Sequence, residues 1–165
     1  MSQPAKEVVL LHPQTITASG NTGTILVPVN SWGALLYLNV GAATGTSPTL
    51  NVWIQQGFRA LTSTDTTDGV PVSATTPTLW DDYAAFANPI SGTGASVMRI
   101  LAEIGTSAAN SPTAQVNAAQ SGAQTASTVK AGPLGMWWRV LWTVGGTSPS
   151  FATTYLVGQF LQEQD

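Results

Sequence analysis

Two near-identical stretches decide the fold class of this chain: Gly-Thr-Ser-Pro-Thr-Leu at residues 45–50 and Gly-Thr-Ser-Pro-Ser-Phe at residues 146–151. A short Gly/Ser/Pro segment between runs of strand-forming residues is typical of a hairpin loop. Such runs flank both copies: 35–40 and 50–54 around the first, 137–144 and 151–157 around the second. We therefore expect two hairpins, with each copy as the loop and the flanking strands paired directly.

Other stretches add strand patterns, and none shows a sustained helical period. Residues 8–11 form a short apolar run, and residues 96–104 alternate between larger apolar and mixed positions. Residues 80–87 have aromatic spacing that also fits a helix, but their short length between prolines favours a strand. The sequence thus predicts an all-β protein: residues 1–165 as a single antiparallel β-sandwich, jelly-roll-like, with about eight strands.

Long polar segments and both ends of the chain are expected to lie outside this sandwich. Residues 57–78 and 105–132 are predicted loops, and the second consists almost entirely of Ala, Ser, Thr, Gln, Asn and Gly. Such a segment is either a solvated loop or an arm that orders on a partner. Residues 1–12 and 159–165 are predicted N-terminal and C-terminal arms, at least one of which adds to a neighbouring subunit.

Composition narrows the function classes. Hydrophobic residues make up 43% of the 165-residue chain and charged residues only 8%, against about 25% in an average soluble domain. Low charge together with six tryptophans suggests that part of the surface is buried against other subunits. A net charge of −3 argues against nucleic-acid binding. The sequence contains no cysteine and no apolar stretch of membrane-spanning length, so we expect no disulfide, no membrane segment and no export signal.

Candidate chemical sites are few. His12 is the only histidine, which argues against a histidine-based triad or a multi-histidine metal site within one chain. Asp81 and Asp82 are adjacent and point to opposite faces of a strand, so solvation or hydrogen bonding to a neighbouring turn suits them better than paired acid–base chemistry. The acidic stretch at residues 65–69 is typical of a turn rather than of a calcium loop. We expect no catalytic residue, no cofactor and no metal.

A candidate interface follows from strand alternation near the second repeat. Trp138, Val140 and Trp142 share one face, which we expect to be the core side, whereas Trp137 and Arg139 share the other. Tryptophan and arginine are enriched at interface hot spots, although the long loop could equally cover Trp137. With the apolar residues of the two arms, the candidate interface is Val8, Val9, Leu10, Leu11, Trp137, Arg139, Phe160 and Leu161.

The order of these stretches resembles small β-sandwich virion proteins of tailed bacteriophages, and is most similar to the head decoration, or cement, type. The stretches that carry the resemblance are residues 19–20, 36–40, 45–52, 80–86 and 138–151. The resemblance implies a non-enzymatic homotrimer, made in the host cytoplasm and seated on the capsid exterior. There it would stabilise the bacteriophage capsid by bridging neighbouring subunits of the major capsid protein.

Two alternatives stay open. A tail, neck or fibre-associated virion protein would share the same β-rich composition. A carbohydrate-binding β-sandwich module would use an exposed tryptophan beside polar residues, for which Trp80-Asp81-Asp82 is the candidate.

Overall fold

The computed structural model describes residues 5–28, 31–58, 77, 79–87, 89–91, 96–103, 121–130 and 134–162. Every regular element in these ranges is a strand, and every pairing is antiparallel, which confirms the all-β prediction. The strands are β1 (Ala5–Ile16), β2 (Gly20–Asn21), β3 (Ile25–Leu26), β4 (Ser31–Val40), β5 (Ala43–Phe58), β6 (Leu79–Ala85), β7 (Ile90–Ser91), β8 (Ser96–Glu103), β9 (Thr128–Val129) and β10 (Trp137–Gln162).

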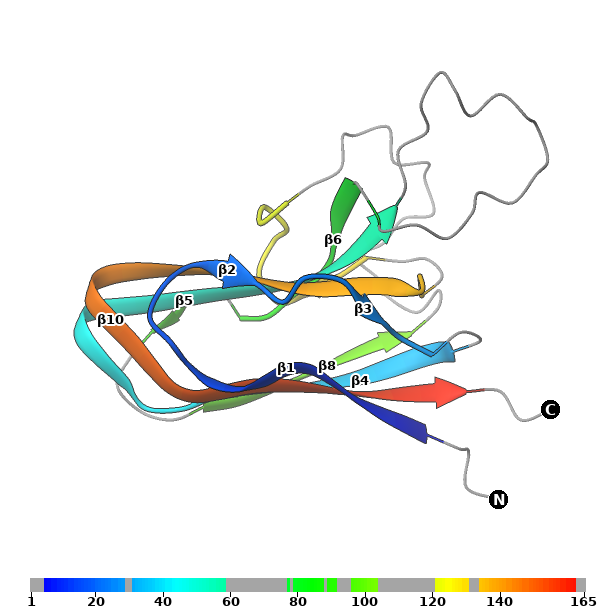
Figure 1. The fold of residues 1–165 in the computed structure, drawn as a ribbon, viewed down its shortest axis with the longest axis horizontal. Coiled ribbons are helices and arrows are strands. Elements are labelled where there is room, and N and C mark those ends of the chain that lie inside the picture. The colour runs from blue at the N-terminus through cyan, green and yellow to red at the C-terminus, as the bar shows by residue number, and fades with distance from the viewer. Residues whose placement is uncertain are drawn as a thin grey trace.

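A long two-stranded ribbon organises the sheet: β10 forms one side of it, and β4 and β5 follow each other along the other side. Strand β10 runs for 26 residues, and β5 and then β4 pair along the same side of it. Gln56 pairs with Trp138 at one end and Ala34 with Phe160 at the other, so 22 residues separate these two pairs on both sides of the ribbon. The register is therefore the same before and after the bend that β10 makes in its middle (Figure 1).

The two Gly-Thr-Ser-Pro copies form that bend together, so the prediction of two hairpin loops is wrong. Residues 35–40 pair with β8 and with the end of β10, and residues 50–54 pair with the beginning of β10. Between Thr49 and Thr46, β5 has one residue more than the part of β10 that faces it. Between Thr147 and Ser150, β10 has one residue more than the part of β5 that faces it. The two bulges cancel, and this restores the register.

Both copies adopt the same unusual backbone conformation. Gly45 and Gly146 have φ values of 108° and 103°, and Ser47 and Ser148 have φ values of 49° and 47°. Bulges with positive φ bend a strand and increase its twist. A hairpin would reverse one strand onto itself; here two strands turn the corner side by side, because each has the same bulge at the same place.

The corner folds one continuous ten-stranded sheet into two facing layers (Figure 1). We call β2, β3, β5, β6, β9 and residues 137–145 of β10 the upper layer, and β1, β4, β8 and residues 155–162 of β10 the lower layer. The core lies between them. Trp138 of the upper layer is fully buried and contacts Phe160 of the lower layer with ring centroids 5.2 Å apart.

The expected core face of β10 is confirmed. Trp138, Val140 and Trp142 all belong to the buried core cluster, and Trp137 and Arg139 are only half-buried. The strand predictions are likewise confirmed for residues 80–85 by β6 and for residues 96–103 by β8, and residue 104 lies outside the described residues. Gly57 and Phe58 belong to β5 rather than to a loop, and residues 59–76 and 78 of that predicted loop lie outside the described residues.

Residues 5–12 and 159–162 do not form arms, contrary to expectation. They pair with each other inside one chain, from Ala5 opposite Leu161 to Val9 opposite Val157. Leu10 and Phe160 are buried in the core. Each terminal segment contains consecutive apolar residues, 8–11 in the first and 160–161 in the second, and the sheet buries Leu10, Leu11 and Phe160 among them. Residues 1–4 and 163–165 lie outside the described residues.

Candidate functional site

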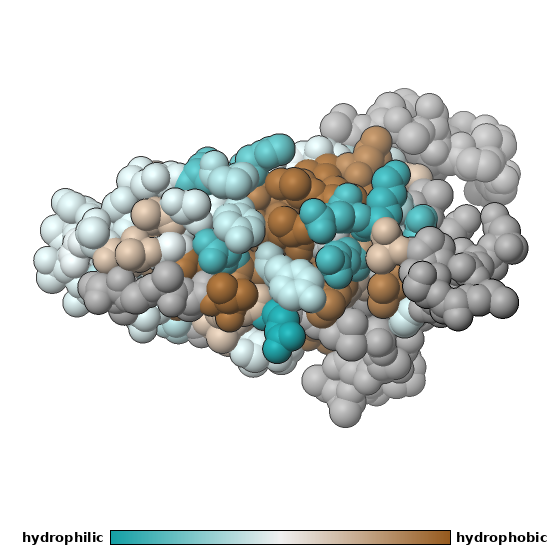
Figure 2. Space-filling view, turned by 90° about the horizontal axis from the view of Figure 1, so that it is seen from below, coloured by the Kyte–Doolittle hydropathy of each residue, from teal (hydrophilic) through white to brown (hydrophobic). Residues whose placement is uncertain are grey.

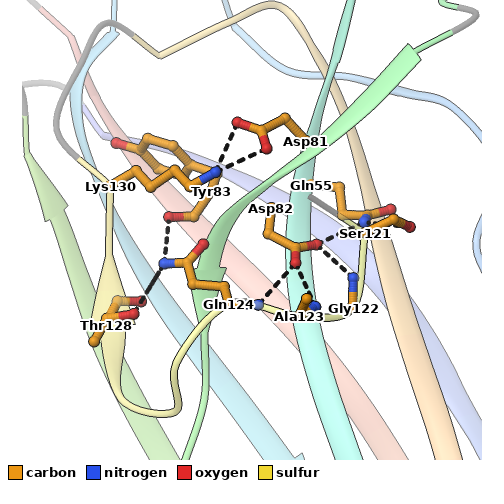
Figure 3. Close-up of polar contacts among 10 residues, drawn as sticks. All are labelled: Gln55, Asp81, Asp82, Tyr83, Ser121, Gly122, Ala123, Gln124, Thr128 and Lys130. Atoms are coloured by element: carbon orange, nitrogen blue, oxygen red, sulfur yellow. Dashed lines mark hydrogen bonds and ion pairs between the residues drawn. The ribbon is translucent and has the colours of Figure 1, made fainter. Parts of the chain in front are cut away.

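A buried carboxylate on β6 is the most highly coordinated polar group among the described residues. Asp82 is fully buried, and its oxygens accept backbone N–H bonds from Gly122, Ala123 and Gln124 at 2.9, 2.8 and 3.0 Å (Figure 3). The Gln55 side-chain amide donates a fourth bond at 2.6 Å. Successive backbone N–H groups around a positive-φ residue, here Gly122 at 70°, form a concave anion-binding nest.

Strand β5 links this carboxylate to a cation. Gln55 donates from Nε2 to Asp82 and accepts at Oε1 from the Nε of Arg139. Burial lowers the pKa of Arg139, and the charge of Asp82 opposes that effect. The guanidinium lies 4.4 Å from the ring centroid of Trp80, within cation–π range.

The three backbone N–H groups that bind Asp82 belong to residues 121–130, which dock on the outside of the upper layer and which we call the docked segment. Lys130 pairs with Asp81 at 2.7 Å, and the Gln124 amide donates to the backbone oxygens of Tyr83 and Thr128. The indole of Trp53 donates to the backbone oxygen of Gln124 at 3.3 Å. Figure 3 shows the contacts of Asp81, Asp82 and Gln124, which join β5 and β6 to the docked segment.

These contacts revise one prediction and support another. For residues 121–130, the segment expected to be a solvated loop or a partner-binding arm orders on its own chain. Asp82 does hydrogen-bond to a turn, as its sequence context suggested, although the turn is about 40 residues away. Three of the four bonds that the carboxylate accepts come from backbone N–H groups, so the arrangement anchors residues 122–124 on the sheet. Residues 105–120, 131 and 132 lie outside the described residues.

The candidate interface residues separate into three environments. Leu10, Leu11 and Phe160 are buried in the core. Val8, Val9 and Leu161 are partly or largely exposed in the lower layer, whereas Trp137 and Arg139 are half-buried in the upper layer. The structure therefore does not bring the set together on one surface.

A different surface gathers apolar side chains: the outward side of the lower layer. Val9, Val157 and Tyr37 lie side by side across β1, β10 and β4. We call the partly or largely exposed residues Val9, Leu35, Tyr37, Val97, Val157 and Leu161 the lower outer face. Figure 2 shows apolar residues gathered on this side of the molecule, interspersed with polar ones. Strand alternation alone could predict that these positions share a face. It could not predict that no strand of the described residues packs over that face.

The open side between β1 and the β2–β3 region holds a pocket of about 740 Å³. Leu10, Leu11 and Trp142 supply apolar walls, and His12 and Asn21 supply polar ones. The Trp142 indole is itself engaged, because its N–H donates to the backbone oxygen of Ala18 at 2.9 Å. Trp142 is only 9% exposed, which is too little to present a stacking platform.

Neither a metal centre nor a membrane-spanning helix occurs in the described ranges. No three histidine, cysteine or acidic side chains come together there as a metal site would require. The described residues also include no helix long and apolar enough to cross a membrane. Comparison with protein-family models, with curated proteins and with solved structures finds no match to this chain.

Proposed function

We propose that this chain is a non-enzymatic virion structural protein that decorates a bacteriophage capsid, with its curled sheet acting as a jelly-roll-like sandwich. The observation that carries the proposal is the lower outer face, an apolar surface on a rigid sheet in a chain with few charges. A preformed sheet loses little conformational freedom when it binds, so most of the free energy of apolar burial is available for attachment.

In this proposal the lower outer face contacts the capsid exterior and bridges neighbouring major capsid subunits. Val9 is 40% exposed, and its neighbours Val157 and Tyr37 extend the apolar surface across three strands. The docked segment stiffens the opposite layer through the buried carboxylate of Asp82. The proposed partner is the major capsid protein, and the proposed role is mechanical stabilisation of the shell.

The carbohydrate-binding alternative depended on Trp80, Asp81 and Asp82. Arg139 stacks on Trp80, Lys130 pairs with Asp81, and Asp82 is fully buried. These three residues thus interact within the chain, so the sequence feature that favoured a sugar site no longer supports one.

Cosedimentation with purified phage heads, followed by electron microscopy of particles with and without the protein, tests the proposal. Val9→Lys should abolish binding to heads, because it places a charge in the apolar surface. Leu26→Lys is the matched control: Leu26 is an exposed apolar residue of β3 in the upper layer, and its change should leave binding intact. Binding to tails instead of heads would support the tail, neck or fibre alternative, and equal loss in both variants would contradict the role of the lower outer face.

A further inference from the structure

Exposed strand edges present unpaired backbone groups, and stable monomers usually protect them. Three edge regions of this sheet carry such protection. Strand β1 has three register shifts along its pairing with β10 and contains Pro13, which has no N–H. Strands β2 and β3 are two residues long each, and β6 is partly covered by β9 of the docked segment.

Strand β8 lacks these devices. It pairs with β4 through eight consecutive residue pairs without a register shift, from Gly33 opposite Glu103 to Val40 opposite Ser96. Residues 96–103 include no proline and no glycine. In the part of the chain that the structure describes, no strand pairs with its other edge. Val97, at 69% exposure, and the exposed Arg99 stand on its outward side.

We propose that this edge pairs antiparallel with β8 of a second copy of the chain. Val97 and Arg99 are exposed on the outward side, so for the lower layers of two copies to continue as one sheet, positions an even number of residues from 99 must come opposite such positions of the other copy. An antiparallel pair centred on position 101 brings position 99 of each copy opposite position 103 of the other. These positions hold an arginine and a glutamate, so opposite charges meet twice.

This charge arrangement selects a second copy as the occupant. Antiparallel pairing of one strand with itself has two-fold symmetry, so a charge pattern that complements itself at one register favours a closed dimer. A register centred on position 99 would instead bring arginine opposite arginine, which is destabilising. The resulting dimer differs from the trimer that the family resemblance implies.

Pairing through β8 would also join two copies of the lower outer face. Position 99 lies opposite Tyr37 of β4, and Tyr37 lies beside Val157 of β10, so the apolar rows would continue on both sides of the new strand pair. Two linked faces bind a repeating lattice more strongly than one, because the second attaches at high effective concentration. The self-association itself requires no capsid, so its test is separate from that of the proposed function.

Sedimentation equilibrium of the full chain over a wide concentration range should give a monomer–dimer equilibrium. Arg99→Glu should weaken the dimer roughly tenfold or more, because two opposite-charge pairs become like-charge pairs. The double variant Arg99→Glu with Glu103→Arg should restore it. Val9→Lys, on strand β1, should leave it unchanged. Circular dichroism confirms that each variant keeps its strand content.

A second measurement follows the backbone. Amide hydrogen exchange in residues 97–103 should slow as protein concentration rises, whereas exchange in β1 should not. A chain that stays monomeric at high micromolar concentration, a trimer, or a dimer insensitive to Arg99→Glu would each overturn the proposal. So would failure of the charge-swapped double variant to recover association while it remains folded.

Discussion

Replacing Gly146 by alanine tests whether the two Gly-Thr-Ser-Pro copies form one corner. A Cβ atom at Gly146 would lie 2.5 Å from the backbone oxygen of Ser47, and one at Gly45 would lie 2.6 Å from the backbone oxygen of Ser148. Both contacts are with backbone, which cannot move aside without opening the paired strands. The φ values of 103° and 108° add strain for any residue with a side chain.

A control at Gly23 separates the loss of stability due to positive-φ strain from the loss due to the steric clash. That glycine has φ of 73°, but a Cβ atom there would meet no other atom within 4 Å. Gly23→Ala should therefore cost only the positive-φ strain, about 1 kcal/mol. Gly45→Ala and Gly146→Ala should each lower the free energy of unfolding by about 3 kcal/mol or more, since backbone strain and a steric clash add. The double variant should cost less than the sum, because the first substitution already opens the shared corner.

Urea unfolding followed by tryptophan fluorescence measures these differences, and thermal unfolding should show a fall of about 6–12 °C for each corner variant. The control should fall by a few degrees only. If Gly45→Ala and Gly146→Ala cost no more than Gly23→Ala, or if the two corner substitutions are strictly additive, the two copies do not act as one packed corner.

Three further predictions concern the core and the docked segment. Asp82→Asn should lower the free energy of unfolding by about 2–3 kcal/mol and speed amide exchange in the docked segment, whereas Asp81→Asn should cost less than about 1 kcal/mol. Trp142→Ala should cost about 3–5 kcal/mol in urea unfolding because it empties a core site, and Trp137→Ala should cost clearly less. Burial raises the pKa of Tyr83 to about 12, so the unfolded chain loses this proton first and stability should fall from pH 10 towards 12. Tyr83→Phe should remove that alkaline decline without loss of stability at pH 7, because the buried hydroxyl has no hydrogen-bond partner among the described residues.

The local sequence pattern was enough to predict strand positions and core faces, because these features depend only on residues that are close in sequence. The alternation of Trp138, Val140 and Trp142 indicated the correct core face. The short length of residues 80–87 between prolines indicated β6, and the alternation of residues 96–104 indicated β8. These features follow from the two-residue period of a strand, which any stretch of chain shows by itself.

Pairing partners could not be predicted in the same way. Residues 35–40 and 50–54 are close in sequence, yet each pairs with a part of β10 about 90 to 120 residues away. A Gly/Ser/Pro break is compatible with a hairpin and with a bulged corner, and only the distant strand distinguishes them. The terminal strands pose the same problem, because their partner is the other end of the chain.

The docked segment was missed for a different reason. Its residues are small and polar, with Val129 the only larger apolar side chain among residues 121–130, so composition suggested a solvated loop or an arm that orders on a partner. It is held by backbone N–H groups that bind a carboxylate. Almost every residue has a backbone N–H, so composition cannot reveal such an interaction. The available signal was Asp82 itself, a carboxylate beside Tyr83 and two alanines in an apolar strand, where burial requires partners.

The pairing of the two Gly-Thr-Ser-Pro copies in one ribbon explains why the motif is repeated. When two paired strands must turn the same corner, a bulge on one strand alone shifts the register and moves every later side chain to the opposite face. A second bulge on the partner cancels the shift, and Thr46 and Thr147 lie opposite each other at the point where this happens. Each copy faces the other antiparallel, so both meet the same local environment and the same residues suit both. Sequence repetition in this chain thus reflects two strands sharing one bend, which keeps Trp138 and Phe160 facing the same core from opposite layers.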